Sequence, residues 1–217
     1  MTKPVKTRRY KSRLRQEQAA LTRQRILDAA GELFVHHGYG TTSIRQVADA
    51  AAVAPDTVYA TFGTKARLLT AVLDIRLAPG GEASILDRPE VRRLREERDP
   101  RQFLRAFARD YAAMSERVRP ASEVLRTAKA VEPEMAVVRE EIEGNRFQFM
   151  RTVVEWLADI TTLRTAVERA AQIVWTLASP DVARMLCDVQ GWTSDEYAAW
   201  LEATLSETLL PKPGDVP

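Results

Sequence analysis

The sequence predicts an all-α protein, with a small N-terminal helical domain followed by a larger helical one. Apolar residues recur at spacings of three and four along most of the chain, which is the period of an amphipathic helix. No stretch alternates apolar and polar residues for long enough to predict a strand. Glycines and prolines divide the pattern into separate helices. We therefore expect a three-helix helix-turn-helix domain, joined by a fourth helix to a larger helical domain.

Positive charge is concentrated at the N-terminus. Residues 1–25 contain nine lysines and arginines against the single acid Glu17, although the whole chain has a formal net charge of only +2. Because residues 1–22 offer almost nothing to bury, we expect a basic, disordered arm there. Such an arm suggests a polyanionic partner. Taken alone, it is equally compatible with a solvated tail.

The chain lacks the sequence features of secreted, membrane-bound and metal-binding proteins. Cys187 is the only cysteine, so no disulfide can form within one chain. No apolar run approaches the roughly 20 residues of a membrane span, and the charged N-terminus has no apolar signal segment after it. His36 and His37 have no ligand-type residues at a suitable spacing, so we predict no metal site and no cofactor. We expect a soluble, cytoplasmic protein without a membrane partner.

The first three helices are predicted from their apolar spacing and their ends. The first begins at Arg23 and ends before Gly38, which suits the left-handed position after a last helical turn. The second begins at Ile44, because Ser43 and Gln46 fit a capping box. The third begins at Pro55 and ends near residues 62–63. The inward residues of the first two helices are Ile26, Leu27, Ala30, Leu33 and Phe34, then Val47, Ala48 and Ala51.

A fourth helix, capped by Thr64, completes a domain that we expect over residues 23–78. Residues 79–99 are charged and weakly periodic, so we expect a connector there. The helical pattern resumes over residues 100–210, and residues 211–217 form a tail. Breaks at Pro120, Pro133, Pro180 and Gly191 help to divide this region into expected helices at 101–118, 122–131, 134–159, 163–178, 181–190 and 194–210.

Two short helices around a tight turn form a helix-turn-helix, in which the second helix enters the major groove of DNA. Val58 and Phe62 are four residues apart and should face the domain core, so the rest of the helix faces outward. Threonine hydroxyls on that face can bond bases or phosphates, and methyl groups can pack on thymine. Tyr59 suits a phosphate contact. The expected DNA-contacting residues are Ser43, Arg45, Pro55, Asp56, Thr57, Tyr59, Ala60, Thr61 and Lys65.

Asp56 is the one acidic residue in this set. A carboxylate is repelled by phosphates, yet at a helix N-terminus it is favoured by about 0.3–1 kcal/mol. Asp56 can therefore stabilise the start of its helix, which we favour, or accept a hydrogen bond from a cytosine amino group.

Residues 26–73 resemble the DNA-binding domain of the tetracycline-repressor (TetR) family of bacterial regulators. The resemblance covers about a quarter of the chain, and residues 168–201 are more loosely similar to carboxy-terminal helices of some members. The most specific matches are the link at 38–42, the helix at 44–51, and Thr57-Val58-Tyr59 with Phe62, Lys65, Leu68 and Leu69.

The chain departs from the family pattern at the turn and along the reading helix. Ala52 stands where glycine is usual, and a left-handed alanine there would cost about 1–2 kcal/mol unless the turn relaxes. Ala54 replaces the usual serine cap, which removes a hydrogen bond worth about 1 kcal/mol. Ala60 and Thr61 replace polar or basic residues, which weakens direct base readout. Arg67 replaces the usual capping glutamate and adds a possible phosphate contact.

The resemblance implies a DNA-binding transcriptional regulator rather than an enzyme. It implies a repressor that binds a palindromic operator in double-stranded DNA as a homodimer and is released by a small-molecule effector. One alternative is a non-specific architectural DNA-binding protein, which the basic arm and Ala60 allow. Another is an all-helical enzyme, although no acid-base or nucleophile motif stands out.

The resemblance also implies a dimer face and an effector pocket in the larger domain. The residues expected at the dimer face are Val167, Ala170, Ala171, Val174, Trp200, Leu201, Thr204 and Leu205. Those expected in the pocket are Phe103, Phe107, Tyr111, Met114, Phe147, Met150 and Trp175. Both sets compete with ordinary core packing, because residues of these types at helical spacing are also what cores contain.

Overall fold

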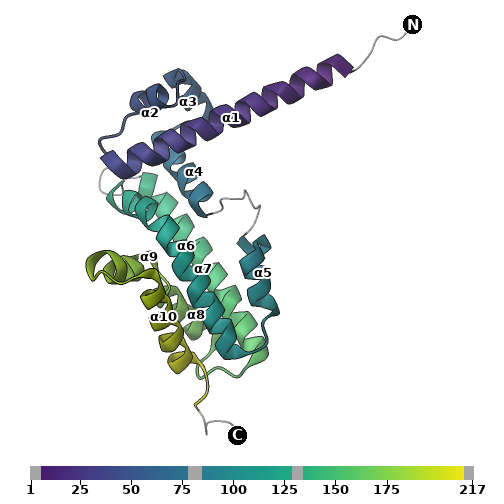
Figure 1. The fold of residues 1–217 in the computed structure, drawn as a ribbon, viewed down its shortest axis with the longest axis vertical. Coiled ribbons are helices and arrows are strands. Elements are labelled where there is room, and N and C mark those ends of the chain that lie inside the picture. Colours follow the sequence, from purple (N-terminus) through teal and green to yellow (C-terminus); the bar gives the residue numbers. More distant parts are fainter. Residues whose placement is uncertain (1–5, 78–84, 129–133, 213–217) are drawn as a thin grey trace. The chain divides into compact units, whose positions relative to one another are not determined.

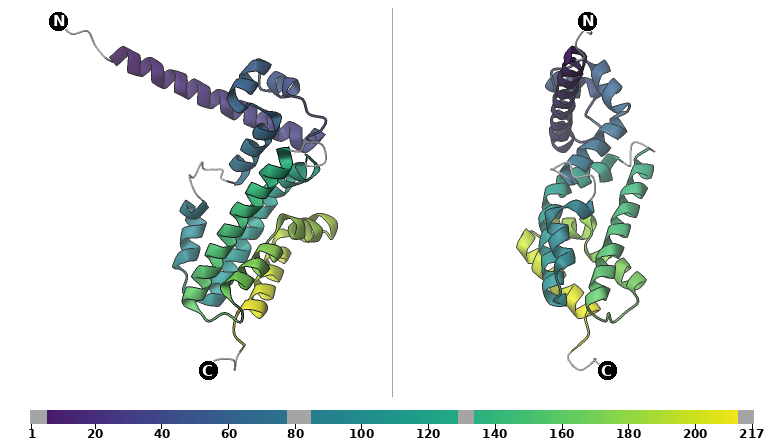
Figure 2. Two further views of the ribbon diagram at one scale, coloured as in Figure 1. Left: turned by 180° about the vertical axis from the view of Figure 1, so that it is seen from behind. Right: turned by 90° about the vertical axis from the view of Figure 1, so that its right-hand side faces the viewer.

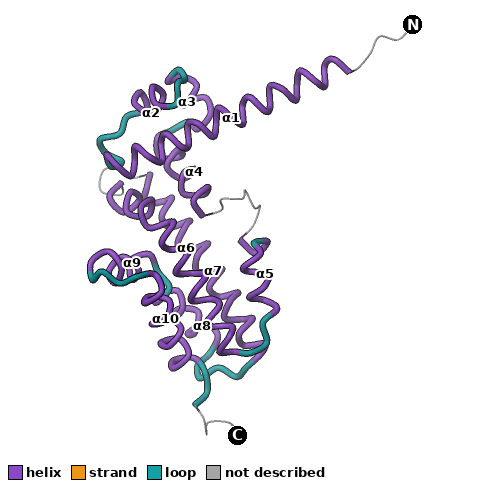
Figure 3. The backbone as a smooth tube through the Cα atoms, in the orientation of Figure 1, coloured by secondary structure: helices purple, strands orange, loops and turns teal. Residues whose placement is uncertain are grey.

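The computed structural model describes residues 6–77, 85–128 and 134–212, and every regular element in this part of the chain is helical (Figures 1 and 3). The chain divides into two compact units, one of residues 1–74 with 123–135 and the other of residues 75–122 with 136–217. Among the described helices, none combines the length and apolar character that crossing a membrane requires.

The first unit contains the predicted helix-turn-helix. Helix α1 spans Lys6–His37, α2 Ile44–Ala50, α3 Pro55–Phe62 and α4 Lys65–Leu77. Helix α2 packs against both α1 and α3 (Figure 1). The predicted inward residues Ile26, Leu27, Ala30 and Phe34 of α1 are buried, as are Val47, Ala48 and Ala51, with only Leu33 partly exposed. The two helical stripes therefore form one small core.

The predicted end of the first helix and the predicted starts of the next three are confirmed. Gly38 has a φ of +82° after α1. The Ser43 hydroxyl accepts a hydrogen bond from the Gln46 amide nitrogen at 3.2 Å, and the Gln46 side chain accepts one from the Ser43 amide at 2.8 Å. Pro55 is the first residue of α3. The Thr64 hydroxyl accepts from the Arg67 amide at 3.1 Å, so it caps α4.

The N-terminal arm differs from the prediction. Residues 6–22 are not disordered but form the first half of α1, while residues 1–5 lie outside the described part. Arginine, lysine, glutamine, alanine and leucine dominate this segment, and all are good helix formers. Because the last proline before it is Pro4, nothing interrupts the helix between Lys6 and His37. The basic residues of the arm therefore lie on a helix continuous with the core of the unit.

The second unit is a bundle built on α6 and α7. The first view of Figure 2 and Figure 1 both show α5 and α10 on opposite sides of these two helices. Helix α8 packs against α10, and the Tyr197 hydroxyl donates a hydrogen bond to the Leu177 carbonyl at 3.0 Å. The elements are η1 (Ile85–Asp87), α5 (Pro89–Glu96), α6 (Pro100–Ala128), α7 (Glu134–Ile160), α8 (Val167–Leu177), α9 (Pro180–Ala183), the π-helical turn η2 (Arg184–Val189) and α10 (Ser194–Leu209).

Three predictions for this region are corrected. The connector expected at 79–99 contains α5, whose Val91 and Leu94 are buried. The break expected at Pro120 is absent, and α6 runs through it. Pro120 is exposed, so the carbonyl that its ring deprives of a partner can be solvated. The helix expected at 163–178 begins only at Val167, because the Arg164 amide bonds instead to the Leu209 carbonyl at 3.0 Å.

Candidate nucleic-acid interface

The turn between α2 and α3 is tight and contains a left-handed residue. Ala52 adopts a φ of +51°, the left-handed conformation that glycine usually supplies. Its amide bonds to the Asp49 carbonyl at 3.1 Å, and the Val53 amide bonds to the Ala48 carbonyl at 3.0 Å, which closes the end of α2. The turn therefore keeps its tight form rather than relaxing.

Arg25 supplies the further support for this turn. Its guanidinium donates hydrogen bonds to the carbonyls of Ala51 and, at 3.2 Å, of Ala52. Charged donors at a helix C-terminus satisfy carbonyls that lack a helical partner, and they complement the helix dipole. The sequence analysis counted Arg25 only among the positive charges of residues 1–25, since no local pattern links it to a turn 26 residues away.

Helix α3 presents one face to solvent and one to the core, as predicted. Val58 and Phe62 are buried, at 1% and 7% exposure. The outward residues Pro55, Asp56, Tyr59, Ala60 and Thr61 are exposed, and Thr57 is partly so. The N-cap residue Ala54 makes no side-chain hydrogen bond, so Pro55 and the dipole-matched Asp56 start the helix without a polar cap.

The polar groups on α3 differ in how free they are to bind. The Thr61 hydroxyl donates to the Thr57 carbonyl at 2.7 Å, so it must rotate before it can donate to DNA. Tyr59 is 52% exposed, which is high for a large aromatic side chain. Its ring lies on the outward face with no core to fill, which is the position expected of a residue that meets a partner.

Cationic side chains surround α3 within the first unit. The Lys65 ammonium lies 4.1 Å from the ring centroid of Tyr39, and the Arg23 guanidinium lies 4.6 Å from that of Phe62. These contacts orient long side chains while leaving them charged. Arg45 and Arg67 are exposed, at the starts of α2 and α4. Ser43 is exposed too, although its hydroxyl already donates to the Gln46 side chain at 2.9 Å.

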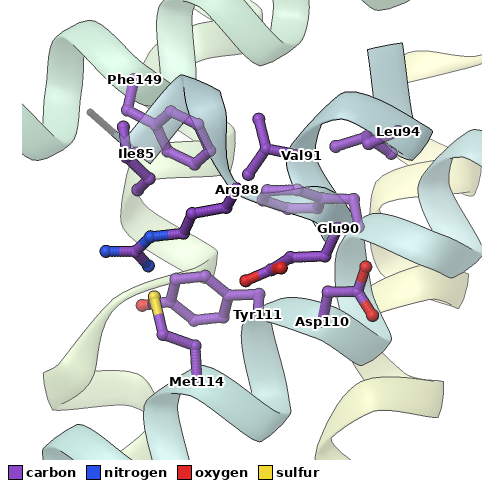
Figure 4. A pocket seen from close by; sticks show the side chains of 10 residues that line it. Ile85, Arg88, Glu90, Val91, Leu94, Asp110, Tyr111, Met114 and Phe149 are labelled. Atoms are coloured by element: carbon purple, nitrogen blue, oxygen red, sulfur yellow. The ribbon is translucent and has the colours of Figure 1, made fainter. Parts of the chain in front are cut away.

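The second unit holds a cavity between α5, α6 and α7 (Figure 4). Of the residues predicted for an effector pocket, Phe107, Tyr111 and Met114 line it. Phe103 and Met150 are buried in the core at 1% exposure and do not. Phe147 and Trp175 pack edge to face at 6.4 Å, and these two also lie outside the lining. The lining residues that the sequence analysis missed are Ile85, Arg88, Glu90, Val91, Leu94, Asp110 and Phe149.

Most of the predicted dimer-face residues lie inside their own subunit. Ala170, Ala171, Val174, Leu201 and Leu205 are buried, at 0–2% exposure. They belong to the hydrophobic core of the bundle, so residues of their own subunit already cover them. Their small and branched side chains let α8 pack within one chain. Val167, Trp200 and Thr204 are partly exposed and stay available for a partner.

Comparison with known proteins gives a match over the helix-turn-helix of the first unit. Residues 26–72 match the model of the tetR family of bacterial regulatory proteins. No curated protein matches the chain.

Solved structures resemble nearly the whole chain in fold. NalD from Pseudomonas aeruginosa, the secondary repressor of the MexAB-OprM multidrug efflux pump, is 23% identical, with a TM-score of 0.67 over 90% of this chain and 99% of that one. PfmR, a TetR family transcriptional regulator from Thermus thermophilus, is 20% identical, with a TM-score of 0.61 over 84% and 97%. A candidate transcriptional regulator from Saccharomonospora viridis, in complex with choline, is 16% identical, with a TM-score of 0.65 over 88% and 98%.

Proposed function

We propose that this chain, which belongs to the tetR family of bacterial regulatory proteins through residues 26–72, is a repressor that binds a palindromic operator as a homodimer and leaves it when a small molecule binds. The observation that carries the proposal is the outward face of α3. That face is exposed, lacks a core to pack on, and is held rigidly by a capped α2 and the Arg25-supported turn.

Helix α3 reads the bases in this proposal. Its N-terminal half enters the major groove, where the methyl groups of Thr57 and Ala60 meet thymine and the threonine hydroxyl meets a base edge or a phosphate. Tyr59 reaches the backbone beside the groove. Asp56 stabilises the helix start, so it contributes little to sequence preference.

Phosphate contacts position the domain on the duplex. Arg45, Lys65 and Arg67 lie at the starts of α2 and α4, where helix dipoles also favour anions. The basic first half of α1 adds sequence-independent attraction. Together these contacts make binding strong and sensitive to salt, while α3 makes it specific.

A second copy of the chain is needed to read a long site. One small helix-turn-helix covers only a half-site, and two such helices about 34–36 Å apart read successive major grooves. The sides of α8 and α10 that their own core leaves partly exposed, which include Val167, Trp200 and Thr204, supply the face for the partner subunit. Acting on chromosomal DNA places the protein in the cytoplasm.

The cavity beside α5 is the proposed effector site. A small molecule that binds one arrangement of the two subunits better than another shifts the spacing of the α3 helices, and the operator is released. The choline complex of the Saccharomonospora viridis protein, which is similar in fold, supports ligand binding as part of this function. The role of NalD as a repressor supports repression over activation.

Selection from a randomised duplex library tests the proposal. The intact protein and a Thr57→Ala/Tyr59→Ala double variant are each used at near-physiological salt, with Gln102→Ala, exposed on α6, as the control. We expect a palindromic motif with the intact protein and the control, and none with the double variant. DNA retained without any motif by all three proteins would contradict the repressor and favour non-specific, architectural binding.

A further inference from the structure

We propose that the cavity beside α5 binds an organic cation, with the positive group between Glu90 and Asp110 and the apolar body over the neighbouring aromatic rings. This inference rests on the proposed effector function and names the class of ligand. It is carried by three properties of the cavity: the position of two carboxylates, the composition of its walls, and the placement of its one arginine.

Two acidic residues from different helices line the cavity. Glu90 comes from α5 and Asp110 from α6, and Figure 4 shows both side chains on the same side of Tyr111. Glu90 is partly buried and has neither a hydrogen bond nor an ion pair within the described residues. The N-terminus of α5 favours this carboxylate through the helix dipole but supplies no counter-ion, so a cation that enters the cavity gains a partner.

Asp110 is compensated only from the outside. Its carboxylate accepts from the Arg109 guanidinium at 3.2 Å, and the Arg109 side chain is 68% exposed. An ion pair between neighbours on an exposed helix surface is weak, because water and salt screen it. Both hydrogen bonds from Arg109 reach the same oxygen, Oδ1, so the second oxygen of Asp110 can still accept from a ligand.

Aromatic rings form the walls next to these acids. Phe107 and Tyr111 stack on successive turns of α6 with their ring centroids 6.0 Å apart, and Phe149 contributes from α7. The faces of such rings attract ammonium groups and pack on apolar chains. Burial raises the pKa of the Tyr111 hydroxyl, so this group stays neutral and accepts or donates hydrogen bonds without adding charge.

Arg88 lies at the other end of the cavity. In Figure 4 its guanidinium lies on the side of the Tyr111 hydroxyl, and the Glu90 carboxylate lies between it and Asp110. The residue is 7% exposed and has an interaction within the chain. A positive ligand group placed between the two carboxylates is thus separated from Arg88, whereas an anion placed there would meet two like charges.

The size of the cavity fits a ligand headgroup. Its volume is about 40 Å³, compared with the 10–15 Å³ that one water molecule needs, and the empty space reaches about 410 Å³ when its open part is counted. The space therefore exceeds that of one water molecule and is open to solvent, so an ammonium group can enter while a larger apolar body extends outward.

Calorimetric titration of the full-length protein without DNA tests the inference. Three probes share a benzyl group: the cation benzyltrimethylammonium, its neutral isostere neopentylbenzene, and the anion phenylacetate. The variants are Glu90→Gln and Asp110→Asn, and the matched control is Glu96→Gln, an exposed acid on α5 outside the cavity. Thermal unfolding of each variant establishes that it is folded.

We expect the cation to bind about tenfold more tightly than the isostere, and Glu90→Gln to weaken cation binding by about tenfold. Asp110→Asn weakens it by a smaller factor, and Glu96→Gln leaves it unchanged. Absence of cation binding, equal binding of the neutral isostere, unchanged affinity in both cavity variants, or preferred binding of phenylacetate would each overturn the inference.

Operator release is measured separately, by fluorescence anisotropy with the selected duplex. Cation binding that depends on Glu90 but leaves the operator bound supports the ligand class and contradicts the effector role. If the protein binds the operator specifically but does not bind the cation, the proposed regulatory function is supported and the ligand class is overturned. The two proposals can therefore fail independently.

Discussion

Ala52 occupies the left-handed conformation at the turn of the helix-turn-helix, where it carries a strain that glycine would not. The sequence analysis identified the position and the cost, because both follow from the identity of one residue. It could not identify the support, since Arg25 is distant in sequence and reaches the turn only in the folded chain. A local departure from the family pattern was thus predictable, and its compensation was not.

Replacing Ala52 with glycine should stabilise the protein. The left-handed strain of about 1–2 kcal/mol is removed, while glycine adds an entropic cost of roughly 0.5–1 kcal/mol. We expect a net gain of about 0.5–1 kcal/mol in the free energy of unfolding, measured with urea. The control Ala60→Gly, in the interior of α3, should lose about 1 kcal/mol. A loss in both variants would show that the turn does not require a left-handed residue.

The capping box of α10 should make stability depend on pH. Glu196 accepts a hydrogen bond from the Thr193 amide at 2.7 Å, and this bond lowers the pKa of the carboxyl below its ordinary value of 4.5. Because the folded-state pKa is lower, the stabilisation is complete above pH 4.5 and is lost as pH falls through the folded-state value. Thermal unfolding should show the wild type losing stability relative to Glu196→Gln below that pH. Parallel pH profiles of the wild type and Glu196→Gln would contradict this pH dependence.

At the scale of elements, α5 is a helix with two buried residues that its charged sequence did not predict. The segment 89–96 has three arginines and two glutamates, and only Val91 and Leu94 mark its inner face. Two apolar residues three apart are too few to distinguish a short helix from a linker. Part of the cavity escaped prediction for the same reason, because half of its lining residues lie between Ile85 and Leu94. Helices with longer apolar stripes, such as α7, were predicted nearly to their ends.

Truncating Leu94 should reveal that α5 is part of the core. Leu94 is 5% exposed and belongs to the main hydrophobic cluster. We expect Leu94→Ala to lower the free energy of unfolding by about 2–5 kcal/mol. The neighbouring control Arg93→Ala is exposed and should change it by less than about 0.5 kcal/mol. Equal, negligible effects would indicate that the segment is a connector after all.

At the scale of the whole molecule, the sequence predicted two helical regions but not what each helix face meets. The stripes of α8 and α10 were correctly identified as apolar, yet most of their residues fill the core of their own subunit. Periodicity indicates that a helix face is buried, but it does not identify the element or subunit that covers this face. The outward face of α3 was predictable because the short helix leaves Val58 and Phe62 as its only core contacts.

Salt dependence should separate the positioning contacts from the reading contacts. We expect Arg45→Gln and Lys65→Gln each to reduce the slope of log affinity against log salt by about one, without altering the selected motif. The measurement is fluorescence anisotropy of the selected duplex over a range of salt concentrations. Arg101→Gln, exposed on α6, is the matched control and should leave the slope unchanged. An altered motif with an unchanged slope would assign these side chains to base readout.

The ratio of specific to non-specific affinity tests the central claim that α3 reads DNA sequence. It is obtained from dissociation constants for the selected palindrome and for a scrambled duplex of the same composition, at near-physiological salt. The account predicts a ratio of about 10³ or more for the intact protein, which collapses in Thr57→Ala/Tyr59→Ala while affinity for the scrambled duplex is retained. A ratio near one for the intact protein, or a high ratio that survives the double substitution, would contradict it.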